Sequence, residues 1–240
     1  MGPSPELRDR VLAAVAAEPV DARAGGARRH LAVLVAGFGL MVPVSVVLGG
    51  PGFRGRPPGY VVAIVISWFA LAVATSWAGV SRGRSMLGRS PLWRAFTAAA
   101  TPATLLVVSL VAGRIWPQML QEAPGAHKRV LWFVAPPQIV CLVATPLFAS
   151  GPLLAFALVR RASDPVAPRV TGAALGAAAA AWAAVAIALH CSRGSVHHVV
   201  VGHVLPAALL PLVGAALCSQ IVAVRGCGDR NAMRRVRPDG

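Results

Sequence analysis

Acidic side chains are scarce in this chain of 240 residues, which has 8 Asp and Glu against 23 Lys and Arg. Charged residues of both signs make up only 13% of the chain, whereas hydrophobic residues make up 56% and the mean hydropathy is +0.67. Such a composition is too apolar for a water-soluble domain of this size, so the solvent of the chain is largely lipid. On a polar chain a net charge of +15 would indicate nucleic-acid binding. Here we expect no direct contact with nucleic acid, because membrane topology explains the basic residues.

Cysteines are also few, and the common catalytic sequence motifs are absent. The 4 cysteines form no C-x-x-C pair and no closely spaced framework, which excludes a small disulfide-stapled fold. The sequence has no phosphate-binding Gly-Lys-Ser/Thr loop, no H-E-x-x-H motif and no paired acids at catalytic spacing, so we predict that the protein is not an enzyme.

Six long apolar runs without Asp, Glu, Lys or Arg dominate the sequence. About 20 apolar residues are enough for a helix to cross the hydrocarbon core of a bilayer. We therefore predict an all-α membrane protein, a six-transmembrane-helix bundle with short loops. The predicted spans are 31–49, 60–80, 95–113, 138–158, 170–190 and 199–222, which form a transmembrane domain over 31–222. A tail over 1–30 precedes this domain, and a basic tail over 223–240 follows it.

Basic residues are distributed unevenly between the two sides of these spans. Of the 23, 17 lie before the first span, in 81–94, in 159–169 and after the last span, and 6 lie in the other three loops. Because loops rich in Lys and Arg stay in the cytoplasm, both ends of the chain are predicted to be cytoplasmic. Heavy use of Arg and Ala with a single Lys is typical of a GC-rich bacterial genome, so we expect the bacterial inner membrane.

A short amphipathic helix is predicted near the N-terminus, over residues 4–17. Ser4 can cap it and Pro5 suits its first position. Its apolar stripe comprises Leu7, Val11, Leu12 and Val15. The helix either rests on the inner leaflet or docks on a soluble protein partner.

Histidine and cysteine gather at the predicted outer ends of the last three spans. Candidate metal-binding or redox-sensing residues are Cys141, His190, Cys191 and His203. Thiolate and imidazole are suitable ligands for zinc or another soft or borderline metal, and a thiol can act as a redox sensor. The alternatives are interfacial histidines that bind loop carbonyls and lipid headgroups, and a Cys141 that only packs. His198 and His203 would lie about 140° apart on an α-helix, so a shared site requires convergence between helices.

Small residues in the fifth span predict close helix packing. Gly172 and Gly176 stand four apart and precede a run of alanines over 177–181. This pattern favours direct approach of two helix backbones rather than a pore.

Several segments resemble the NrsF-type polytopic anti-sigma factors (negative regulator of sigma F), and within them the myxobacterial CarR-like membrane anti-sigma factors. These segments are S-P-E-L-R-D-R-V-L-A-A-V-A-A-E-P at 4–19, R-R-A-S-D-P-V-A-P-R-V-T-G at 160–172, A-L-H-C at 188–191 and G-H-V-L-P at 202–206. The six-span plan with minimal loops is also similar. Ser192 departs from the pattern, since proline is expected after His-Cys.

The resemblance implies a regulator that holds an extracytoplasmic-function sigma factor at the inner membrane. Release would follow an envelope, redox, metal or light-linked signal, and the residues matching the family's membrane cysteines are Cys141 and Cys191. The stripe of the N-terminal helix would bind the sigma factor. The alternative is a small polytopic transport or export component, although the absence of charge within the spans weighs against coupled transport.

Overall fold

The computed structural model describes residues 6, 31–47, 56–80, 90–117, 137–161, 167–191, 193 and 195–222. Within these ranges the chain is helical apart from short caps and turns, and no strand occurs in them. The predicted all-α class is confirmed. The docking residues predicted in the N-terminal helix, Leu7, Val11, Leu12 and Val15, lie outside the described residues, as does the tail over 223–240.

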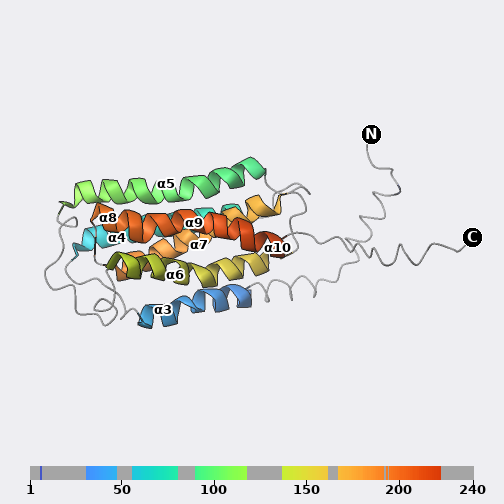
Figure 1. The fold of residues 1–240 in the computed structure, drawn as a ribbon, viewed down its shortest axis with the longest axis horizontal. Helices are drawn as coiled ribbons and strands as arrows, with labels where there is room; N and C mark the ends of the chain where they lie inside the picture. The colour runs from blue at the N-terminus through green and yellow to red at the C-terminus, as the bar shows by residue number, and fades with distance from the viewer. Residues whose placement is uncertain are drawn as a thin grey trace, which may run out of the picture.

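Between residues 31 and 222 the described ranges form six helical segments. These segments run alternately up and down the molecule (Figure 1). The first is the apolar helix Leu31–Val47, whose second part is α3 (Met41–Val47). Four long helices follow, α4 (Pro58–Val80), α5 (Pro91–Ile115), α6 (Pro137–Val159) and α7 (Pro168–His190). The last segment is continuous but has five parts, α8 (Val196–Val199), η3 (Val200–Val204), α9 (Leu205–Val213), η4 (Gly214–Cys218) and α10 (Ser219–Val222), of which η3 and η4 are π-helical turns.

Five of these segments, α4 to α7 and Val196–Val222, are long and apolar enough to cross a membrane, and Leu31–Val47 is apolar but shorter. Their length and composition indicate a membrane protein.

Proline marks the start of the four long helices. Pro58, Pro91, Pro137 and Pro168 each stand at the first helical position, where the missing N–H has no intrahelical partner to lose and the fixed φ suits the helix. At α5 the Ser90 hydroxyl also accepts a hydrogen bond from the Trp93 backbone N–H at 3.3 Å. Local sequence therefore determines where the helices begin.

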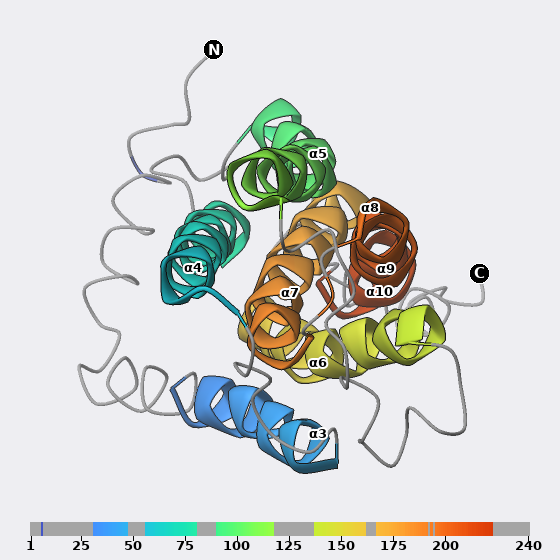
Figure 2. The same cartoon turned by 90° about the vertical axis from the view of Figure 1, so that its left-hand side faces the viewer.

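Helix α7 occupies the middle of the bundle and is surrounded by α4, α5, α6 and the last segment (Figure 2). Fifteen of its 23 residues are buried, and the alanines over 177–181 are fully inaccessible. Large apolar side chains instead lie on the outside, including Leu92, Trp77 and Leu212. Small residues inside and large ones outside are typical of helices that pack together in lipid, where close backbone approach replaces the hydrophobic effect.

Glycines make the closest contacts between helices. A Cβ atom added at Gly172 would collide with the carbonyl oxygen of Gly214, and one added at Gly176 would collide with that of Leu210. The close approach predicted from the spacing of Gly172 and Gly176 is confirmed, and its partners are η4 and α9. Gly37 and Gly151 form a similar contact between the first helix and α6.

Candidate functional site

Four metal-binding side chains converge at the end of the bundle where α7 ends and α8 begins, called here the cluster end. They are Cys141, Cys191, His198 and His203, and the one ligand atom that each offers lies within 4.8 Å of the other three. The Cys191 sulfur is 3.1 Å from Nε2 of His198, and the rings of His198 and His203 meet edge to face with centroids 5.1 Å apart. Cys141, Cys191 and His198 are buried, each with an exposed fraction of 3%, and His203 is half-buried.

Four elements hold these residues in place. Cys141 lies in the first turns of α6, His198 on α8 and His203 on η3. Cys191 directly follows α7, and its backbone N–H donates to the carbonyl oxygen of Ile187 at 2.7 Å. The α7 backbone thus fixes the position of the thiol.

The π-helical turn η3 brings the two histidines together. On a regular α-helix residues five apart lie on different faces, which is the reason for expecting that His198 and His203 would diverge. In η3 the backbone hydrogen bonds span five residues, so the turn is wider and residues five apart fall nearly above one another. The expected divergence is wrong for this reason, and π-turns of this kind are frequent at functional sites.

A threonine hydroxyl and a glycine join η3 to α6 beside the cluster. Thr145 donates to the carbonyl oxygen of Cys141 at 2.8 Å and to that of Gly202 at 3.1 Å. A Cβ atom added at Gly202 would lie 3.0 Å from the Cys141 Cβ, closer than ordinary carbon contacts. Glycine at this position therefore allows His203, the next residue, to lie close to Cys141.

Two imidazole nitrogens at the cluster are buried without a hydrogen bond from the described residues. They are Nδ1 of His198 and Nε2 of His203. Buried polar atoms in folded proteins are nearly always paired, and leaving one unpaired costs about 1 to 3 kcal/mol. Two sulfurs and two imidazoles form a donor set that suits tetrahedral Zn²⁺. The residues present therefore fit a bound metal ion, with no acidic ligand required.

The surroundings of Cys191 favour its thiolate. The hydrogen bond from the Cys141 thiol is the largest influence, and it lowers the pKa of Cys191 well below the ordinary value despite burial. Contacts with His203 and His198 lower it further. Thiolate is the form of cysteine that binds metals and reacts with electrophiles.

The structure brings together three of the four sequence-predicted site residues, Cys141, Cys191 and His203. His190 lies outside the group of four; its Nδ1 is 2.7 Å from the Ala186 carbonyl oxygen, and its ring packs against Phe148 with centroids 5.3 Å apart. His198 takes the fourth place. No sequence signal distinguishes it from the neighbouring, exposed His197, because the distinction depends on the π-turn.

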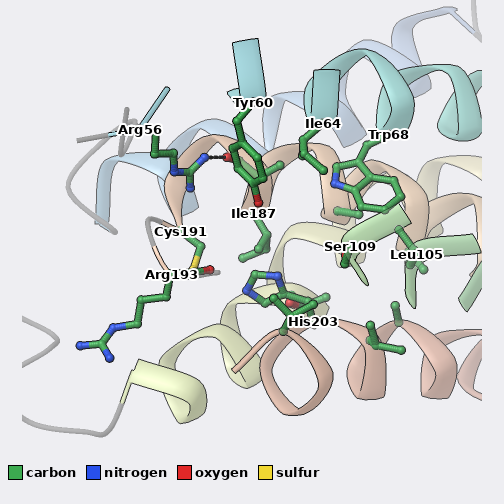
Figure 3. A pocket seen from close by; sticks show the side chains of 17 residues that line it. Arg56, Tyr60, Ile64, Trp68, Leu105, Ser109, Ile187, Cys191, Arg193 and His203 are labelled. Atoms are coloured by element: carbon green, nitrogen blue, oxygen red, sulfur yellow. Dashed lines mark hydrogen bonds between the residues drawn. The ribbon is translucent and has the colours of Figure 1, made fainter. Parts of the chain in front are cut away.

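A cavity of about 50 Å³ opens beside the cluster (Figure 3). Cys191 and His203 line one side, and Tyr60, Ile64 and Trp68 of α4 line the other. Of the four clustered residues, Cys141 and His198 do not line this cavity.

A buried arginine lies near the other end of the bundle. Arg94, expected in the loop over 81–94, lies within α5 with an exposed fraction of 2% and donates through Nη1 to the hydroxyl of Thr171 at 2.5 Å. The predicted span 95–113 placed this charge outside the helix, but Pro91 starts the helix earlier and carries Arg94 into it.

Comparison with known proteins identifies a protein family that matches the chain. Residues 12–223 match the family described as negative regulator of sigma F. No curated protein and no solved structure matches the chain. The match covers most of the chain, including all six helical segments and the four clustered residues. The chain therefore belongs to the family of negative regulators of sigma F, whose description indicates a regulatory role with a sigma factor as the partner.

Proposed function

We propose that the protein is an anti-sigma factor that spans the inner membrane six times, sequesters an extracytoplasmic-function sigma factor and releases it on a signal. The match to a family of negative regulators of sigma F over residues 12–223 is the observation that carries this proposal. The up-and-down order of the helical segments and the excess of basic residues at one set of loops support both termini being cytoplasmic (Figure 1). The cluster end is then the outer end.

The N-terminal helix is the proposed binding element for the sigma factor. Its apolar stripe of Leu7, Val11, Leu12 and Val15 has the spacing of an amphipathic helix that docks in a groove. An Asp on this stripe would have to be buried on docking without a partner, which is costly. The double variant Leu12→Asp/Val15→Asp should therefore lose the sigma factor in a co-purification from detergent-solubilised membranes.

The matched control for this experiment is Ala13→Asp, which places a carboxylate on the opposite face of the same helix. This variant should retain the sigma factor. Equal retention by the stripe variant and the control would contradict the proposed role of the helix.

The cluster is the proposed sensing site, with a bound Zn²⁺ or another soft or borderline metal held by Cys141, Cys191, His198 and His203. When bound, such an ion would supply Lewis-acid coordination bonds to these four side chains. The protein itself supplies the preformed arrangement, since Thr145 and Gly202 join α6 to η3 next to the donors.

Metal content tests the sensing site. The purified parent should retain about one metal ion, as expected for a single four-ligand site. Cys191→Ser and His203→Gln should lose it, whereas His197→Gln should retain it because His197 is exposed and outside the cluster. The same metal content in Cys191→Ser as in the parent would refute the site.

The arrangement of helices offers a route from the cluster to the cytoplasmic end. The last segment leaves the cluster at η3 and meets the start of α7 through the contact of Gly214 in η4 with Gly172. Because the backbones touch there, α9 cannot move along α7 without disturbing η4 and α10. A change at the cluster is proposed to reach the sigma-binding surface through this contact.

A further inference from the structure

An apolar groove lies on the outside of the bundle between α4 and α5, at the end opposite the cluster. These two helices lie next to each other (Figure 2). The groove has a volume of about 590 Å³, which is in the size range of ligand-binding clefts. Six of its lining residues come from α4 and Trp93 comes from α5, and none of them carries a charge. The groove therefore suits an apolar ligand.

Two rows of α4 side chains shape this groove. Members of a row are four residues apart, so they follow one another along the same side of the helix. Large side chains form one wall, which consists of Phe69, Val73 and Trp77. Small side chains form the floor next to it, and these are Ala70, Ala74 and Ala78. With Trp93 as the opposite wall, the groove runs along α4 between aromatic rings, a shape that suits an extended hydrocarbon chain.

Contacts with neighbouring rings hold both walls in place. The Phe69 ring meets the Trp182 ring edge to face, with centroids 5.5 Å apart. Trp182 is itself fixed, because its Nε1 donates to the hydroxyl of Ser76 at 2.9 Å. On α5 the Trp93 ring stacks on Phe96, with centroids 5.8 Å apart. The groove is therefore preformed, which lowers the entropic cost of binding a ligand.

The depth of the groove matches one leaflet of a bilayer. Trp77 lies three residues before the end of α4 at Val80, and Phe69 lies eleven residues before it. At 1.5 Å per residue, the groove runs from about 4 Å to about 16 Å below the helix end. Half of a hydrocarbon core about 30 Å thick is about 15 Å. An acyl chain lies along this direction, whereas an amphipathic helix at the membrane surface lies across it and fills only the rim.

The sequence that joins α4 to α5 places positive charge near the rim. Residues 81–89 connect Val80 to Ser90, and they contain three arginines and no acidic residue. A connection of nine residues keeps each of them within about 18 Å of a helix end, since the chain spans at most about 3.6 Å per residue. An anionic headgroup complements this charge, and a neutral headgroup does not.

We propose that this groove binds an acyl chain of an anionic phospholipid, whose headgroup lies at the rim next to Trp77 and Trp93. Indole rings are enriched at this level of a membrane, because they combine an apolar body with a hydrogen-bond donor. Under the topology proposed above, the lipid belongs to the cytoplasmic leaflet. The site shares no residue with the metal cluster or the N-terminal helix, so it gives the protein a further ligand.

Filling the floor of the groove tests the site. Ala74 and Ala63 are both exposed on α4, but only Ala74 lines the groove. Ala74→Leu should therefore block the acyl chain, whereas Ala63→Leu adds the same side chain outside the groove and is the matched control. Native mass spectrometry of each full-length chain in detergent, incubated with phosphatidylglycerol, measures the lipid that it retains. Ala74→Leu should lose the lipid that the parent and Ala63→Leu retain, and equal retention by the two variants would overturn the proposal.

The preference for an anionic headgroup is tested on the parent chain. Phosphatidylglycerol and phosphatidylcholine with the same acyl chains differ in net charge, because only the first is anionic. At low ionic strength the parent should bind phosphatidylglycerol at least about fivefold more tightly, which is the effect of one arginine near an anionic surface. Equal affinities for the two lipids would overturn the anionic phospholipid as the ligand.

The alternative occupant of the groove is a second copy of the chain. In that case light scattering would find a dimer of the parent in detergent and a monomer of Ala74→Leu, and this result would overturn the lipid site. The proposal predicts the same oligomeric state for the parent, Ala74→Leu and Ala63→Leu. None of these measurements involves a metal or a sigma factor, so failure of the lipid site leaves the regulatory proposal standing.

Discussion

Replacing Gly176 with alanine should force the central helix away from the last segment. The added Cβ would lie 2.8 Å from the carbonyl carbon of Leu210 and 2.9 Å from the Cα of Pro211. Ordinary carbon contacts begin near 3.5 Å, so the two backbones must separate by roughly 0.7 Å. Overpacking of this kind costs about 1 to 3 kcal/mol. Alanine recovers at most about 1 kcal/mol through its higher helix propensity, so the overpacking term prevails.

Gly39→Ala is the matched control, because no atom lies within 4 Å of a Cβ added there. It should be neutral or slightly stabilising. In a chain of this length 1 kcal/mol corresponds to about 2 to 4 °C in Tm, so Gly176→Ala should unfold several degrees below the parent in detergent micelles. If Gly176→Ala unfolded at the same temperature as Gly39→Ala, α7 and α9 would not pack backbone to backbone, and the reasoning would be refuted.

Three other substitutions test the site and the opposite end. Thr145→Val removes the hydroxyl that joins α6 to η3 and should weaken metal binding about tenfold in a chelator competition, as loss of a supporting hydrogen bond usually does; unchanged affinity would contradict its role. Elemental analysis should find no bound metal in His198→Gln, whereas His197→Gln should retain it. Metal retained in both variants would show that His198 is not a ligand. Thr171→Val removes a hydrogen-bond acceptor from the buried Arg94 and should lower the free energy of unfolding by about 1 to 3 kcal/mol, measured by thermal unfolding. An unchanged melting temperature would show that this hydrogen bond contributes nothing to stability.

Hydropathy predicts most of this fold because the lipid environment restricts which sequences can form a membrane-spanning helix. A span must be long and apolar with few or no charges, and the prolines at 58, 91, 137 and 168 mark where the long helices begin. The pair Gly172 and Gly176 also identifies α7 as a site of close packing, since only small residues permit that approach. These signals depend only on neighbouring residues, so the positions and close packing of the helices can be predicted from the sequence.

The fourth residue of the cluster depends on information that is not local. His198 and His203 converge only because η3 is a π-turn, and hydrophobic periodicity does not distinguish such a turn from an α-helix. His190 and His198 are equally plausible in the sequence, and only tertiary packing turns one toward Phe148 and the other toward Cys191. The burial of Arg94 also depends on non-local information, because Thr171, which accepts its hydrogen bond, is distant in sequence.

Membrane fractionation of the partner sigma factor tests the central claim most directly. In cells that express the full chain, we expect this sigma factor to sediment with the membrane fraction, and to become soluble when the gene is deleted or when Leu12→Asp/Val15→Asp replaces the parent. A sigma factor that remains soluble in the presence of the parent chain would contradict the account.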